Sequence, residues 1–193
     1  MAAMLTAAIP AAAQFSDSYN FLKAIRDKDA EKVTQFIQGN GATLVNTRDF
    51  TSGEGAIHIV IKRRDDIWLR FLLGNGANPN LRDKAGNPPL ALCAQIGFSE
   101  GVDSLLERRP DVNLANDQGE TPLIIAVQRR DIVIVKQLLA AGADAKKADH
   151  IAGMSARDYA ARDTRSTAIL RAIDDAAKTA KPATAAKVAG PGL

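Results

Sequence analysis

The chain repeats itself with a period close to 33 residues, and this periodicity restricts the fold more than any other feature. Four segments each carry a pair of bulky apolar residues, followed by a short string that is polar or contains glycine. The pairs are Phe36-Ile37, Leu72-Leu73, Leu105-Leu106 and Leu138-Leu139. A unit of this length cannot bury its apolar face alone, so successive units must stack side by side into a solenoid.

A small or medium apolar residue precedes each pair by 12 and 13 positions and acts as an anchor for the unit. The anchors are Ala24, Val60, Cys93, Ala126 and Ala160, at intervals of 36, 33, 33 and 34 residues. The extra residues of the first interval fall in turn-like stretches around Gly41 and Gly53, where insertions cost least. The chain therefore holds five units in series.

Helix signals accompany the anchors. Thr121 is a favourable N-cap, Pro122 suits the first helical position, and Ser155 with Asp158 forms a capping box. In the fourth unit, apolar residues follow helical spacing up to Gly142, which suits the end of a helix. Each unit is therefore predicted to contain two short helices.

These patterns resemble the ankyrin repeat. The family's helix-opening motif is fullest at Thr121-Pro122-Leu123-Ile124-Ile125-Ala126 and partial at 55–60 and 88–93. The resemblance implies an all-α solenoid of five stacked helix-turn-helix units joined by hairpin-like fingers. The predicted units are 17–49 as an N-terminal cap, 50–83, 84–116, 117–149, and 150–175 as a C-terminal cap.

The ends of the chain differ from the repeats. Residues 1–13 are uncharged and rich in alanine, and Ala11-Ala12-Ala13 offers a cleavage site before Gln14, as at the end of a signal peptide. A positively charged n-region is missing, so either Met1 is not the true start or the segment is a disordered lead. We expect an exported bacterial protein in the periplasm, or a cytoplasmic one if the segment is not a signal. Residues 176–193 are expected to form a disordered basic tail.

Composition excludes several functional classes. The net charge of +3 comes from three lysines in residues 176–193, which leaves 22 bases and 22 acids in the rest of the chain. A neutral body argues against nucleic-acid binding. One cysteine and two histidines are too few for a zinc module, and no apolar run is long enough to span a membrane. No metal or other cofactor is therefore expected.

No catalytic constellation is visible, so we expect a protein that is not an enzyme. Cys93 occupies an anchor and is expected to be a buried, inert thiol. His58 takes the histidine position of the repeat motif, where the resemblance implies that the ring ties neighbouring loops together. The residues with an expected structural role are His58, Thr121, Pro122 and Ser155.

The resemblance also implies a protein partner, bound in a concave groove and along the fingers. The groove candidates, directly after the anchors, are Arg26, Lys62, Arg63, Gln95, Gln128, Arg129 and Arg162. The finger candidates are Arg82, Lys84, Asn116 and Gln118. The basic residues favour an acidic partner, and Arg63 and Arg129 are expected to have little tertiary role. The alternative is an inhibitory, immunity or chaperone-like subunit of a co-exported enzyme. A monomer is expected.

Overall fold

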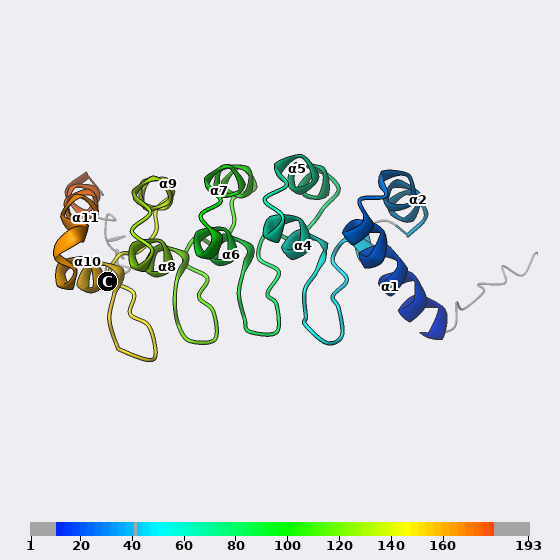
Figure 1. Ribbon diagram of the computed structural model, residues 1–193, viewed down its shortest axis with the longest axis horizontal. Coiled ribbons are helices and arrows are strands. Elements are labelled where there is room, and N and C mark those ends of the chain that lie inside the picture. The colour runs from blue at the N-terminus through cyan, green and yellow to red at the C-terminus, as the bar shows by residue number, and fades with distance from the viewer. Residues whose placement is uncertain (1–10, 41, 180–193) are drawn as a thin grey trace, which may run out of the picture.

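The computed structural model describes residues 11–40 and 42–179, and these form a row of five stacked helix pairs (Figure 1). The pairs, in chain order, are α1 (Ala11–Asp27) with α2 (Ala30–Asn40), α4 (Ala56–Lys62) with α5 (Asp66–Gly74), α6 (Pro89–Ile96) with α7 (Ser99–Leu106), α8 (Pro122–Gln128) with α9 (Ile132–Ala140), and α10 (Ala156–Arg162) with α11 (Thr167–Thr179). The four-residue helix α3 (Ala42–Val45) follows the first pair, and a 3-10 turn, η1 (Thr164–Ser166), joins the last two helices.

The first helices of the pairs form an inner layer, the second helices form an outer layer, and four long loops project beyond the inner layer (Figure 1). Within the described ranges there is no β-strand, only two isolated bridges, Arg48 with Gly55 and Ala148 with Ser155, each closing one projecting loop. The predicted all-α solenoid is confirmed.

The helices begin where the sequence signals predict. The Thr121 hydroxyl accepts a hydrogen bond from the Ile124 N–H at 3.2 Å, and Pro122 is the first residue of α8. Ser155 and Asp158 form the predicted capping box at the start of α10. These side chains satisfy N–H groups that the first helical turn leaves without partners.

The anchors form the centre of the core. Ala24, Val60, Cys93, Ala126 and Ala160 are all at most 4% exposed. Their small size lets inner helices of adjacent units approach closely, and the first leucine of each Leu–Leu pair is fully buried against them. The pair Phe36-Ile37 in the first unit is only partly buried, as fits a terminal cap.

The turn between the inner and outer helix of a unit needs a residue in the left-handed conformation. Lys28, Arg64, Gly97 and Arg130 occupy this position, with φ between 50° and 70°. Three of the four carry a side chain, although such residues adopt positive φ at a cost of about 1–2 kcal/mol. The sequence does not reveal this position, because glycine, the usual marker of a left-handed turn, occupies it in only one of these units.

At the C-terminal end the structure corrects the prediction that residues 176–193 form a disordered tail. Helix α11 continues to Thr179, so residues 176–179 are helical and not part of a disordered tail. The remainder of the expected tail, and residues 1–10 of the expected signal segment, lie outside the described residues. Residues 11–13 form the first turn of α1.

Candidate partner-binding surface

The projecting loops are four fingers of similar construction: finger 1 (48–55), finger 2 (82–88), finger 3 (115–121) and finger 4 (148–155). One side chain at the start of each finger accepts hydrogen bonds from backbone N–H groups two to four residues ahead. These residues are Asp49, Asp83, Asn116 and Asp149. Each finger therefore has an internally fixed turn.

Adjacent fingers are also joined at their tips. The N–H groups of Lys84, Asp117 and His150 donate to backbone carbonyls of the preceding finger, at 3.0, 3.3 and 2.9 Å. The acceptors are Ser52, Ala85 and Gln118. We call this row of hydrogen bonds the finger ladder. It makes the four fingers one continuous, ordered surface.

The imidazole ring of His58 links finger 1 to finger 2. Its side chain is fully buried, Nδ1 accepts from the Gly55 N–H at 3.1 Å, and Nε2 lies 3.3 Å from the Asn87 carbonyl oxygen. Burial lowers the pKa of His58, so the ring is neutral and Nε2–H is the donor to Asn87. The ring therefore bonds to both neighbouring fingers, and its contribution to stability stays a prediction.

A second series of side chains links neighbouring units and was missed from the sequence. The Oδ1 atoms of Asn46, Asn80 and Asn113 accept from backbone N–H groups of the next unit at 2.7, 2.9 and 2.7 Å. The donors are Asn78, Asp111 and Asp144. The spacing of these asparagines, 34 and 33 residues, is the signal that could have revealed them.

Arg63 corrects one expectation about the groove. Its Nη1 donates to the carbonyl oxygens of Ile25 and Arg26, at 2.5 and 3.3 Å, and its side chain is only 22% exposed. Arg63 therefore satisfies the C-terminal carbonyls of α1 and ties the second unit to the first. The expectation that it has little tertiary role was wrong, because a carbonyl end of the neighbouring helix lies within its reach.

The other groove candidates differ in how strongly the rest of the chain engages their side chains. Arg26 forms an ion pair with Asp49, Lys62 pairs with Glu54, and Gln95 donates to Asn87 Oδ1 at 3.2 Å. The remaining candidates, at the C-terminal ends of the last two inner helices, are exposed: Gln128, Arg129 and Arg162. The Gln128 side chain forms a hydrogen bond with Tyr159. Within 11–40 and 42–179, the Arg162 guanidinium has one hydrogen-bond partner, the Met154 sulfur at 3.8 Å, and the Arg129 guanidinium has no hydrogen-bond or ion-pair partner.

Two of the four finger candidates hold the fingers together and are not free for a partner. Arg82 donates to the carbonyls of Gly86 and Ala115 and to the Asp117 carboxylate, at 2.8, 3.1 and 2.8 Å. Asn116 is 6% exposed, because its side chain fixes the turn of finger 3.

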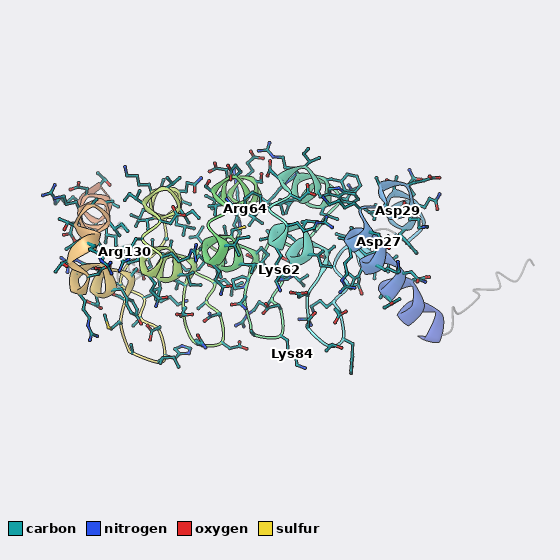
Figure 2. The ribbon with its side chains drawn as sticks, in the orientation of Figure 1. Asp27, Asp29, Lys62, Arg64, Lys84 and Arg130 are labelled. Carbon is teal, nitrogen blue, oxygen red and sulfur yellow. The ribbon has the colours of Figure 1, made fainter. Side chains whose placement is uncertain are left out.

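The other two finger candidates remain accessible. The Lys84 side chain projects from the tip of finger 2 (Figure 2). The Gln118 side chain is exposed at the tip of finger 3, where its backbone carbonyl takes part in the finger ladder.

The arginines at the left-handed turns, both of which are labelled in Figure 2, each connect a unit to the corresponding turn of the next unit. Arg64 donates to the Gly97 carbonyl at 2.8 Å, and its guanidinium lies 5.7 Å from the centre of the Phe98 ring. Arg130 pairs with Asp163 and, as the largest cause, holds the pKa of that carboxyl at about 2. These contacts explain the use of arginine where the backbone favours glycine.

The described residues offer few side chains that could take part in catalysis or metal binding. Cys93 is fully buried, and burial raises the pKa of its thiol far above its usual value. Among the described residues, no three His, Cys, Asp or Glu side chains gather as metal ligands would. None of the helices in this part of the chain combines the length and apolarity that a membrane crossing requires.

A family model of ankyrin repeats, in three copies, matches residues 21–116, 68–149 and 92–178, and the chain belongs to this family. An ankyrin repeat-containing protein of Treponema pallidum (strain Nichols) is 29% identical over 143 residues, covering 73% of this chain and 46% of that protein. Neurogenic locus notch homolog protein 1 of Xenopus laevis is 34% identical over 137 residues, 70% of this chain and 5% of that protein.

An ankyrin repeat protein of Fowlpox virus (strain NVSL) is 29% identical over 135 residues, 62% of this chain and 39% of its own length. The chain thus spans less than half of each of these relatives. Ankyrin repeats in general mediate protein–protein interaction and are not catalytic domains.

Proposed function

We propose that this chain is a non-enzymatic adaptor that binds a protein partner along its fingers and the inner helices α8 and α10. The observation that carries the proposal is the finger ladder, which holds four polar fingers in one row beside the exposed inner-helix side chains. A surface that is ordered before binding loses little conformational entropy when a partner docks.

The free charges favour an acidic partner. Arg129 and Arg162 are exposed on consecutive inner helices, whereas Arg26 and Lys62 are balanced by Asp49 and Glu54. The electrostatic attraction for an acidic partner is therefore concentrated in the fourth and fifth units. Exposed charges of this kind mainly accelerate association, and their effect decreases as salt is added.

We also propose that the protein acts outside the cytoplasm, because its N-terminal residues resemble the end of a signal peptide. We propose in addition that it acts as a monomer.

Capture from the native compartment, with mass-spectrometric identification, supplies the partner. Its affinity is then measured for the wild type, for Arg129→Glu with Arg162→Glu, and for the control Arg108→Glu, which alters an exposed arginine at the end of outer helix α7.

The double variant is expected to bind about tenfold more weakly at low salt, with a smaller difference at moderate salt, while Arg108→Glu binds as the wild type does. Equal affinities and equal salt dependence for all three proteins, with the fold intact, contradict the proposed groove. Turnover of the captured partner by the chain contradicts the adaptor function.

A further inference from the structure

The finger ladder is open at its first rung. Phe50 follows Asp49 in finger 1 as Lys84 follows Asp83 in finger 2, and the Lys84 N–H donates backward to the preceding finger. In the part of the chain that the structure describes, no finger precedes finger 1. The Phe50 N–H holds the position equivalent to the Lys84 N–H, but it donates to no carbonyl among residues 11–40 and 42–179.

A cavity of about 350 Å³ lies between α1 and finger 1, and Phe50 is one of its lining residues. Leu22 forms its buried part, while Tyr19 on α1 and Phe50 at the finger tip are 62% and 97% exposed. Aromatic side chains are enriched in the centres of protein interfaces, where they supply large contact areas at low entropic cost. Two exposed rings beside one cavity therefore indicate a place where an apolar group docks.

The rim of this cavity is positively charged. The Asp49 carboxylate is already engaged by the N–H groups of Thr51 and Ser52 and by Arg26, at 3.0, 3.0 and 3.1 Å. Arg48 uses one guanidinium nitrogen to bond the Arg82 carbonyl, at 3.2 Å, and its other nitrogens have no partner within the described ranges. A carboxylate on the bound partner would complement this charge.

We propose that the space between α1 and finger 1 binds an extended peptide segment of the partner protein. A main-chain carbonyl of the segment accepts from the Phe50 N–H and so continues the finger ladder by one rung. A bulky apolar side chain of the segment lies between Tyr19 and Phe50, and an acidic side chain near it pairs with Arg48. This inference rests on the proposed function and identifies one subsite of it.

The test uses a displayed library of random peptides selected against the whole chain, followed by synthesis of the enriched peptides. We expect them to share a bulky apolar residue next to Asp or Glu. Phe50→Ala and Tyr19→Ala are each expected to weaken binding by about tenfold or more. Ile151→Ala, which removes a 79% exposed apolar side chain from the tip of finger 4, is the matched control and is expected to bind as the wild type does.

Amide exchange measured by NMR tests the open rung directly. In the free chain the Phe50 amide is expected to exchange rapidly, while the amides of Lys84, Asp117 and His150 are protected by the ladder. Adding a selected peptide should protect the Phe50 amide.

Three results would overturn the inference: selection without any enriched peptide, equal binding by Phe50→Ala, or a Phe50 amide that the peptide leaves unprotected. If protection of the Phe50 amide instead rises with the concentration of the chain alone, a second copy of the chain occupies the space between α1 and finger 1. The peptide proposal would then be wrong. Because Arg129 and Arg162 lie on other units, failure of this subsite and failure of the proposed function are seen in separate variants.

Discussion

Replacing His58 with alanine tests how the units are held together. The change removes the acceptor for the Gly55 N–H and the donor for the Asn87 carbonyl. Gly55 is buried, so its N–H loses its partner without access to water, whereas Asn87 is only partly buried and water can replace part of the lost bond. An unpaired buried group costs about 1–3 kcal/mol, and we expect the free energy of unfolding to fall by this amount.

The pH dependence of stability provides a second measurement on the same variant. Burial lowers the pKa of His58 from its usual 6.5, so the unfolded chain takes up a proton near that pH and the folded chain does not. The wild type should therefore lose stability as the pH falls from 7.5 through 6.5. The lowered carboxyl pKa values, such as that of Asp163, act only below about pH 4 and leave this window unaffected.

Urea denaturation followed by circular dichroism at pH 7.5 and 5.5 measures both effects. His150→Ala is the control, since His150 is exposed in finger 4, and it should change the free energy of unfolding by less than about 0.5 kcal/mol. If His58→Ala is as stable as the wild type, or keeps the same loss of stability between the two pH values, the structural role assigned to His58 is wrong.

Three further predictions concern the core, the contact of Arg63 with the end of α1, and the N-terminus. Leu138→Ala should lower the free energy of unfolding by about 2–5 kcal/mol because Leu138 is fully buried, and Val133→Ala, at a 54% exposed site on the same helix, should cost much less in the same urea titration. Arg63→Ala should destabilise the chain by about 1–2 kcal/mol through loss of the α1 contacts, while Arg129→Ala should not; equal melting curves would contradict this difference. Export predicts a mature chain beginning at Gln14, and intact-mass measurement of a native protein that retains Met1 would contradict it.

The periodicity of the sequence was sufficient to predict the architecture. A small anchor followed by two bulky apolar residues at constant spacing predicts a stack of helix pairs. Each unit can bury its apolar face only against a neighbouring unit. The caps at Thr121 and Ser155 could be predicted for a local reason, since their partners lie three residues away. Helix α3 could not, because four residues give no periodicity.

The site was harder to predict because several of its side chains, such as Arg63 and Arg82, bond to groups more than 30 residues away. Position after an anchor placed Arg63 and Arg129 in equivalent places, yet of the two only Arg63 donates to the C-terminal carbonyls of the preceding inner helix within the described residues. Arg82 and Asn116 were assigned to partner binding from polarity alone, whereas the structure uses both to shape and join fingers. Polarity identifies a residue that needs a partner, but it does not say whether that partner belongs to the same chain.

Hydrogen–deuterium exchange of the chain with and without its captured partner tests the central claim most directly. The account predicts that bound partner slows exchange in the fingers and in the inner helices α8 and α10, and leaves the outer helices α5, α7 and α9 unchanged. Slowed exchange confined to the outer helices, with the fingers exchanging as they do in the free chain, would contradict it.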